Sequence, residues 1–288
     1  MIIGSAKGGV TLPNKNNSTV SLAAAAGPSG SVSGENLKVY IKFDDVDGNP
    51  ANTAVDITDN DTLGSAADLI LGGTGDMDYG VTGTPTNLGN ATTFPQTDTN
   101  TGRWADFGTS TSQFNFMFST EGGDAPTWTM CFWAKTSVAQ TLGTSFLNCA
   151  RGQGTKGFEL YWATGAALTL MMYNGLSGNP TGRPFNYANF TDFSTDGDWH
   201  FYAFTMDGGL ASNQYKVRRD AETIQEFSKT AGAFATTGDA DHFLQWRTQN
   251  PYMYIPPTTS YLEFSLFARV LTSEELETLY QNGDGFQL

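Results

Sequence analysis

The sequence predicts an all-β protein, either a sandwich or a barrel, and three observations support this prediction. Short stretches rich in β-branched and aromatic residues recur along the chain, separated by Gly, Asn and Asp residues that are typical of turns. Only one segment has helical periodicity. The 288 residues suit one large β domain or two small ones, and no internal repeat is apparent.

Composition excludes several classes of protein. The chain has 29 Asp and Glu residues against 15 Lys and Arg, a formal net charge of −14, which argues against nucleic acid or anionic lipid as a partner. Its 39% hydrophobic and 13% aromatic content is too high for a disordered chain. No apolar run approaches the roughly 18 residues of a membrane span. We expect a soluble globular protein without membrane insertion.

Residues 1–36 are predicted to form an extended N-terminal arm. They are mostly Gly, Ser, Ala, Asn and Thr, with almost no large apolar side chains, so they cannot bury enough surface to fold alone. The segment has neither the basic start nor the long apolar stretch of a secretory signal. We expect the arm to be ordered either by its own domain or by a neighbouring subunit.

Residues 37–288 are predicted to hold the β domain. The strand candidates, in chain order, are residues 38–43, 128–135, 157–162, 167–173, 200–206 and 261–267. Residues 158–172 have the pattern of two strands joined by a turn that contains glycine. Large side chains at both odd and even positions of 128–133 indicate a strand covered on both faces.

The one helical segment is residues 272–280. Thr272 followed three residues later by Glu275 predicts a capping box, and Leu276, Leu279 and Tyr280 fall on one helical face. Gly283 is placed to end the helix. We expect a short helix that closes one end of the sandwich.

The two cysteines, Cys131 and Cys149, are too few for a disulfide scaffold. No route to an oxidising compartment is visible in the sequence, so we expect two buried thiols.

An acidic region follows the first predicted strand. Residues 43–102 contain ten Asp and no Lys or Arg, and such a block repels itself unless it is hydrated or neutralised by a cation. Calcium prefers carboxylate and carbonyl oxygens, and the candidate ligands are Asp44, Asp45, Asp47 and Asp56. Their spacing is close to that of an EF-hand loop, but Pro50 replaces the required turn glycine and no helices flank it. A solvated acidic surface is the alternative.

Several landmarks occur in a specific order. They are residues 37–44, the segment Trp104 to Gly108, residues 128–135, the segment Asp196 to Gly208, and residues 263–276. Together these landmarks resemble the laminin-G-like, concanavalin A-like jelly-roll domains, over roughly residues 37–283.

The resemblance implies a jelly-roll sandwich of two antiparallel sheets. It places Trp133 and Trp199 in or near the core, and it gives His200 a structural role beside Trp199. The chain departs from the family where relatives usually carry an Asp-Glu pair opening the last strand, because it has Leu262 and Glu263 there. The usual glycine of the preceding strand is also replaced, within residues 244–247. Both departures weaken the transfer of a calcium site from the family.

No catalytic residues are predicted. Some relatives of this fold are glycoside hydrolases, which need two carboxylates reaching the sugar from one face. Asp220, Glu222 and Glu226 lack the alternating arrangement that would supply such a pair, and neither His200 nor His242 accompanies a nucleophile motif. We expect a protein that is not an enzyme, with a glycan-active enzyme as the less favoured alternative.

Aromatic residues in predicted loops are candidates for carbohydrate binding, because their flat faces stack on sugar rings. The candidate ligand-binding residues are Tyr187, Trp246, Tyr252 and Tyr254. Aromatic residues also fill cores and subunit interfaces, so a structural role for these four remains open.

The favoured function is a binding or structural module on the surface of a virus particle, such as a phage head decoration, head fibre or tail adhesin. The apparent lack of an export signal and the low-complexity arm motivate this hypothesis, which rests on analogy with phage surface proteins that carry laminin-G-like modules. Residues 1–36 would dock on other virion proteins, and the jelly roll would face a host-surface glycan. The alternative is a secreted or surface-tethered lectin, and either form could be a homo-oligomer.

Overall fold

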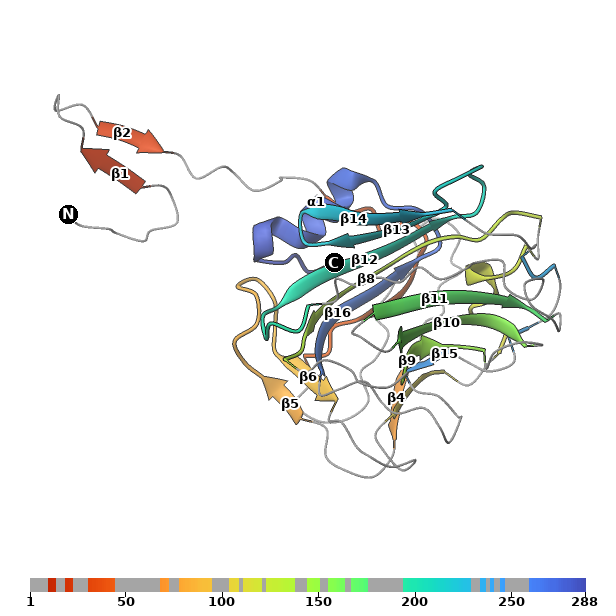
Figure 1. Ribbon diagram of the computed structural model, residues 1–288. Coiled ribbons are helices and arrows are strands. Elements are labelled where there is room, and N and C mark those ends of the chain that lie inside the picture. Colours follow the sequence, from red (N-terminus) through yellow and green to blue (C-terminus); the bar gives the residue numbers. More distant parts are fainter. Residues whose placement is uncertain are drawn as a thin grey trace.

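In its described residues, the computed structural model contains two antiparallel sheets that pack face to face, a separate pair of short N-terminal strands, and one short α-helix near the end of the chain (Figure 1). It describes residues 10–13, 19–22, 31–44, 68–72, 78–94, 104–108, 111–120, 123–137, 144–150, 155–163, 167–175, 194–228, 234–236, 239–240, 244–246 and 259–288. Every pairing between named strands in these ranges is antiparallel. The predicted all-β sandwich is confirmed.

The smaller sheet has six strands in the order β11-β10-β9-β15-β7-β4. Their bounds are β4 (Leu69–Gly72), β7 (Trp104–Phe107), β9 (Thr144–Asn148), β10 (Lys156–Ala163), β11 (Ala167–Asn174) and β15 (Leu244–Trp246). Strands β10 and β11 form the hairpin predicted for residues 158–172, with Leu160 opposite Leu170.

The larger sheet has eight strands. Seven follow the order β14-β13-β12-β8-β16-β6-β5, and β3 also pairs with β16. Their bounds are β3 (Leu37–Ile41), β5 (Asp78–Val81), β6 (Ala91–Phe94), β8 (Thr127–Lys135), β12 (His200–Asp207), β13 (Tyr215–Arg219), β14 (Glu222–Phe227) and β16 (Thr259–Phe267). The six strands predicted from the sequence are therefore all present, as β3, β8, β10, β11, β12 and β16.

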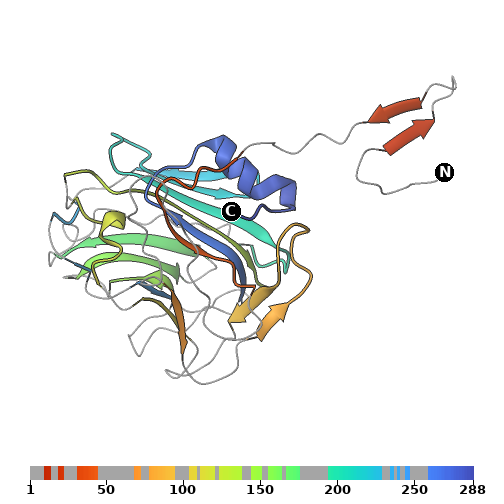
Figure 2. The same cartoon turned by 180° about the vertical axis from the view of Figure 1, so that it is seen from behind.

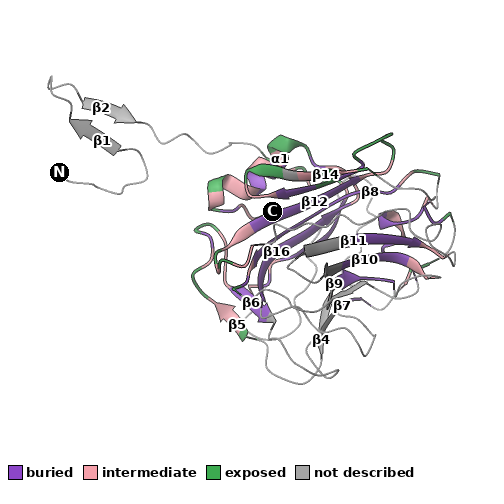
Figure 3. Ribbon diagram, viewed as in Figure 1, coloured by how far each residue is buried: buried purple, intermediate pink, exposed green. Residues whose placement is uncertain are grey.

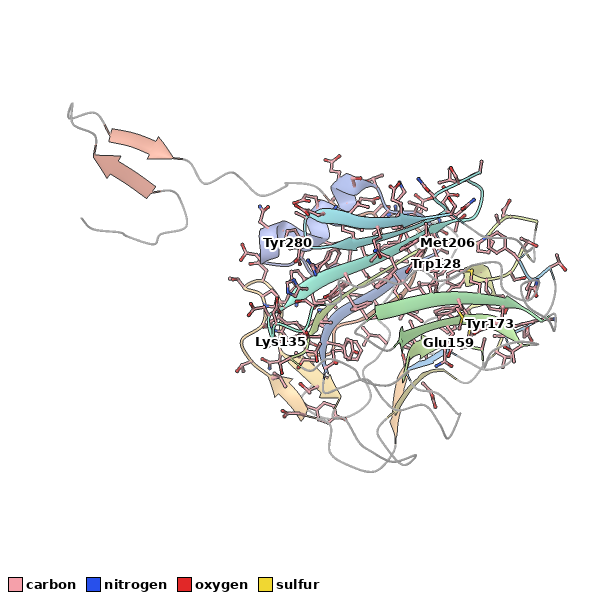
Figure 4. The ribbon with its side chains drawn as sticks, in the orientation of Figure 1. Trp128, Lys135, Glu159, Tyr173, Met206 and Tyr280 are labelled. Carbon is pink, nitrogen blue, oxygen red and sulfur yellow. The ribbon has the colours of Figure 1, made fainter. Side chains whose placement is uncertain are left out.

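The main core lies between the two sheets. The alternation of strand side chains turns Phe132, Phe204 and Val217 of the larger sheet toward Phe158 and Met172 of the smaller one, all at 1% exposure or less. Trp128 of β8 lies opposite Met206 of β12, and its indole nitrogen donates to the carbonyl oxygen of Met117 at 2.8 Å (Figure 4). Met117 ends the 3-10 turn η2 (Asn115–Met117). This layer holds the sandwich together.

A second apolar layer covers the other face of the larger sheet. Helix α1 (Ser273–Tyr280) places Leu276 and Leu279 against Trp133 and Phe201, and Tyr280 stacks on Trp133 with ring centroids 6.0 Å apart (Figure 2). The helix therefore lies along a sheet face. The expectation that it closes one end of the sandwich was wrong. Strand β8 is consequently buried on both faces, as its side-chain pattern predicts (Figure 3).

The capping box predicted for the helix is present. The Thr272 hydroxyl accepts from the backbone N–H of Glu275 at 3.2 Å, and the Glu275 carboxylate accepts from the N–H of Thr272 at 2.9 Å. Helix α1 ends at Tyr280, and Gln281, whose φ of 44° is left-handed, is its C-cap and begins the short turn η3 (Gln281–Gly283). The residue that caps the helix is therefore Gln281 and not Gly283, two residues later.

The described part of residues 1–36 has two portions. Strands β1 (Val10–Pro13) and β2 (Thr19–Leu22) pair with each other and, within the described residues, with no strand of the sandwich. Ser33 and Glu35 contact the sandwich, since their carbonyl oxygens accept from the Arg269 guanidinium at 2.8 and 2.9 Å. The division into an arm at 1–36 and a domain at 37–288 remains a prediction.

Both cysteines are free and buried, as expected. Burial raises the pKa of the Cys131 thiol above its usual range. Within the part of the chain that the structure describes, no helix has the length and apolar content needed to cross a membrane.

Candidate functional site

A groove lies on the outer face of the larger sheet, and we call it the outer groove. It lies between strands β12 to β14 and the segment that leads into α1, and its volume is about 300 Å³. Its lining combines apolar residues with polar ones that include Thr205, Asp207, Lys216, Arg218, Thr223 and Ser273. Its volume matches the lower end of small-ligand sites, about 300 to 1,000 Å³.

Strand periodicity places these polar side chains on one face. In β13, Tyr215 and Val217 point into the main core, so Lys216 and Arg218 point outward. The register pairs Thr205 with Lys216 across the sheet, which puts both beside the groove. The sequence therefore builds a polar surface directly behind the core.

Arg218 joins the sheet to the helix at the floor of the groove. Its side chain is 8% exposed, its Nε donates to the Asp220 carbonyl oxygen at 2.6 Å, and its Nη2 forms an ion pair with Glu277 of α1. Its Nη1 donates to the Ser273 carbonyl oxygen at 3.5 Å. Burying a guanidinium is tolerated because hydrogen bonds and an opposite charge surround it.

Lys216 and Glu226 form a cross-strand ion pair at one side of the groove. The Lys216 ammonium lies 3.0 Å from one carboxylate oxygen of Glu226, and the side chains are 46% and 40% exposed. The other carboxylate oxygen accepts from the Asn213 amide at 3.0 Å. An exposed pair of this kind adds little to stability, but it neutralises the lysine.

An apolar rim completes the groove. Leu210, on the turn after β12, is 45% exposed and is the one exposed large hydrophobic residue among those the structure describes. The Gln214 amide holds this turn by donating to the Leu210 carbonyl oxygen at 2.6 Å. Val270 and Leu276 lie in the lining across from it. The groove therefore offers hydroxyl and amide groups next to a small apolar surface.

The groove has the chemistry of a binding site. Its described lining contains no histidine or cysteine, and its cations are engaged in ion pairs.

A buried polar centre lies where β16 is irregular. Glu263 has a φ of 51° within the register shift between Leu262 and Ser265. Its carboxylate accepts from the Tyr40 hydroxyl and, at 3.4 Å, from the Gln287 amide. Burial raises the pKa of Glu263 to about 7. The adjoining cavity of about 10 Å³ is too small for any ligand larger than a water molecule.

His200 ties three segments together at the start of β12. Its Nδ1 lies 2.7 Å from the carboxylate of Asp220, in the turn between β13 and β14, and its Nε2 lies 3.1 Å from that of Asp196. The hydrogen bond to Asp220 is the largest cause of a raised His200 pKa. The backbone N–H of Asp198 is the largest cause of an Asp196 pKa lowered to about 2. This arrangement supports the structural role inferred for His200, and Trp199 beside it packs against the second apolar layer.

A third polar set lies on the outer face of the smaller sheet. Glu159, which is 4% exposed, accepts from the Tyr173 hydroxyl at 2.9 Å (Figure 4). The buried carboxylate of Asp106 is three strands away, past Asn148 and Gln245 in the register. Three strand spacings amount to about 14 Å between backbones, whereas glycosidase carboxyl groups lie about 5 to 9.5 Å apart. Glu159 and Asp106 are thus not placed as an acid and base pair.

The predicted calcium ligands fall mainly outside the described residues. Asp45, Asp47 and Asp56 lie there, and only Asp44, three residues beyond the end of β3, is described. Among the described residues, no group of three or more His, Cys, Asp or Glu side chains is arranged to hold a metal ion. Calcium binding by Asp44, Asp45, Asp47 and Asp56 remains a prediction.

The predicted aromatic ligand-binding residues also remain untested. Tyr187, Tyr252 and Tyr254 lie outside the described residues, and Trp246 is placed only by its backbone, at the end of β15. The outer groove was not foreseen. Its signal in the sequence is the alternation of Lys216 and Arg218 with buried residues, but the wall formed by residues 270–276 is far away in sequence.

Comparison with known proteins finds likeness in structure alone. No family model matches the sequence, and no curated protein matches it. Among solved structures, the binding domain of botulinum neurotoxin serotype D aligns with a TM-score of 0.54 and 11% identity, over 86% of this chain and 51% of that one. The chain therefore spans about half the length of the structures it matches.

Two other neurotoxin structures are similarly related. The binding domain of botulinum neurotoxin DC in complex with SialylT aligns with a TM-score of 0.56 and 10% identity, over 86% of this chain and 51% of that one. A structure of botulinum neurotoxin type C, whose cell entry depends on interaction with two ganglioside molecules, also aligns. Its TM-score is 0.55 and its identity 10%, over 85% of this chain and 51% of that one. At such low identity, these likenesses show the β-sandwich fold. The resemblance to laminin-G-like domains remains a prediction.

Proposed function

We propose that this protein is a non-enzymatic module that binds carbohydrate in the outer groove. The observation that carries the proposal is the groove itself, about 300 Å³ in volume, in which threonine hydroxyls adjoin an apolar rim. A hydroxyl both donates and accepts hydrogen bonds, as sugar hydroxyls do. Two proteins with a similar fold support carbohydrate as the ligand class: a neurotoxin binding domain in complex with SialylT, and a neurotoxin whose cell entry depends on interaction with two ganglioside molecules.

The test is a glycan array probed with the labelled protein, followed by calorimetric titration of the best ligand. Thr223→Trp fills the groove from an exposed position of β14 and is expected to weaken binding at least about tenfold. The matched control is Glu222→Trp, one residue earlier and outside the groove lining. Equal binding by both variants would place the ligand elsewhere, and an array without any bound glycan would refute carbohydrate binding.

We further propose that the module is displayed on a virion surface, with residues 1–36 as its attachment to other virion proteins. The pairing of β1 with β2, and with no described strand of the sandwich, supports an arm that folds apart from the domain. A secreted or cell-surface lectin is the alternative context.

Deletion of residues 1–30 tests this attachment, because it retains Ser33 and Glu35, which contact Arg269. In the expected result, purified particles contain the full chain but not the shortened one, while both chains melt at the same temperature. Particles that lack the full chain would contradict the virion location. Particles that contain both chains would contradict a role for the arm.

A further inference from the structure

The charged groups at the outer groove are arranged in a way that bears on which ligands it accepts. Both of its cations are already paired: Arg218 with Glu277, and Lys216 with Glu226 at 3.0 Å. Each pairing involves side chains of the same outer surface, on β13, β14 and α1. Neither cation of the groove lining therefore presents an uncompensated charge to a ligand.

Arg218 is not available to bind an anionic ligand as an exposed arginine is. Its Nε, Nη1 and Nη2 all donate within the protein, and its side chain is only 8% exposed. Bidentate recognition of a carboxylate requires two guanidinium donors on one edge. Breaking the bonds to Glu277 and Ser273 would leave the buried Arg218 guanidinium without these partners, which is costly.

Lys216 is accessible, but its charge is compensated. Its side chain is 46% exposed, and Glu226 lies between it and Asn213. Asp207 adds a further carboxylate to the lining. Three carboxylates thus stand against two cations around the groove, on a chain whose net charge is −14. An anionic sugar would meet repulsion there.

The remaining binding groups are neutral. Thr205 and Thr223 contribute hydroxyls from neighbouring parts of the sheet, and Ser273 contributes one from the helix start. Leu210 supplies an exposed apolar surface beside them. This combination matches a sugar ring, which has hydroxyls at its edge and C–H groups on its face.

From these contacts we infer that the outer groove selects uncharged glycans and rejects sialylated or sulfated ones. The inference rests on the proposed carbohydrate-binding function and specifies its ligand class. The Glu226–Lys216 pair is the element that sets this selectivity, because it cancels the one accessible positive charge of the groove.

The test uses glycan pairs that differ by one sialic acid, presented on the same array and then titrated in solution. For pairs in which either member binds, the uncharged member is expected to bind at least about threefold more tightly at low salt. Equal or tighter binding of the sialylated members would overturn the inference while leaving carbohydrate binding intact. Binding of neither member in any pair would instead contradict the proposed function itself.

A charge variant tests the cause. Glu226→Gln leaves the Lys216 charge uncompensated, so the ratio of uncharged to sialylated binding should fall by roughly three- to tenfold, and added salt should reduce this effect. Glu222→Gln is the matched control, since it removes the same charge from the same strand without touching Lys216 and should leave the ratio unchanged. Equal shifts in both variants would show that net charge, and not this ion pair, sets the selectivity.

Discussion

Glu263 is a carboxylic acid that the fold holds in a left-handed backbone conformation and in a buried position. A left-handed φ of 51° and the register shift in β16 turn its carboxyl group inward, where it is 6% exposed beside Tyr40. The sequence had marked this position as a departure from the family pattern. It did not reveal the burial, which depends on β3 and on Gln287 packing over it.

Glu263→Gln should stabilise the protein at alkaline pH. The pKa of Glu263 is raised from 4.5 to about 7 on folding, so the neutral form is favoured in the folded state. Stability from this group is fully present below pH 4.5 and falls as the pH rises through 7. The variant should exceed the wild type by about 1 to 3 kcal/mol at pH 8, and by less than about 1 kcal/mol at pH 5.

Urea unfolding at both pH values measures this difference. Glu222→Gln, at an exposed carboxylate, is the control and should show no such pH dependence. A variant less stable than the wild type at pH 8 would mean that the Tyr40 contact outweighs the burial of charge.

His200→Gln should remove a stabilising contribution that the wild type has at acidic pH and loses at basic pH. The raised pKa of His200 means that the protonated ring stabilises the fold through Asp220 and Asp196. This stability is fully present below the unfolded pKa of 6.5 and is lost as the pH rises through the folded pKa. The stability gap between wild type and variant should therefore be larger at pH 5.5 than at pH 9 in thermal unfolding, and an equal gap would contradict the ion-pair role.

At the scale of elements, helix α1 depends on its first turn. Arg269 binds both oxygens of Glu275, at 2.7 and 2.9 Å, and also binds the carbonyl oxygens of Ser33 and Glu35. This arginine is the largest cause of a Glu275 pKa lowered to about 2. The capping box thus connects the helix to the segment that precedes β3.

Thr272→Ala should destabilise the protein by about 1 kcal/mol, because it removes the hydroxyl that caps the N–H of Glu275. Chemical unfolding measures the loss. Ser273→Ala, one residue later, is the matched control, and its expected effect is below about 0.5 kcal/mol. Similar losses in both variants would rule out a specific contribution from the cap.

The elements that the sequence predicts are those with long or regular apolar patterns. The apolar patterns of residues 128–135 and 261–267 predict buried strands, and Thr272 with Glu275 predicts the start of the helix. Strands β13 and β14 were not foreseen because their outward positions carry Lys216, Arg218 and Glu226. The packing of α1 on a sheet face also depends on contacts between distant segments, so a local pattern cannot supply it.

For the whole molecule, the same limit explains why the candidate site differs from the predicted ones. The outer groove joins residues 203–223 to residues 270–276, two segments that meet only through the sheet and the helix. Loop aromatics and acidic runs are visible in a sequence, whereas a groove between distant segments is not. The recurring short strand patterns and the turn residues between them, by contrast, predicted the fold class correctly.

Calcium binding by the acidic region should change the stability of the whole folded protein. If Asp44, Asp45, Asp47 and Asp56 bind the ion, calcium should raise the melting temperature and protect residues 44–56 from proteolysis, because ligand binding stabilises the folded state. Differential scanning calorimetry with and without calcium measures the first effect. Asp45→Asn should abolish the rise in melting temperature, and the exposed control Asp124→Asn should not. A wild-type melting temperature that calcium leaves unchanged would favour a solvated acidic surface.

The burial of β8 between two apolar layers has a consequence for how this protein can evolve. Trp128 to Ala134 are all buried, and apart from Thr129, whose hydroxyl is hydrogen-bonded to the backbone of Arg269 and Leu271, their side chains would lose packing on replacement by a polar residue. Substitutions should therefore accumulate at exposed positions such as Leu210 and Thr223 in the outer groove, where they leave the core packing unchanged. Distant relatives should share the aromatic and aliphatic character of β8 and differ in what they recognise.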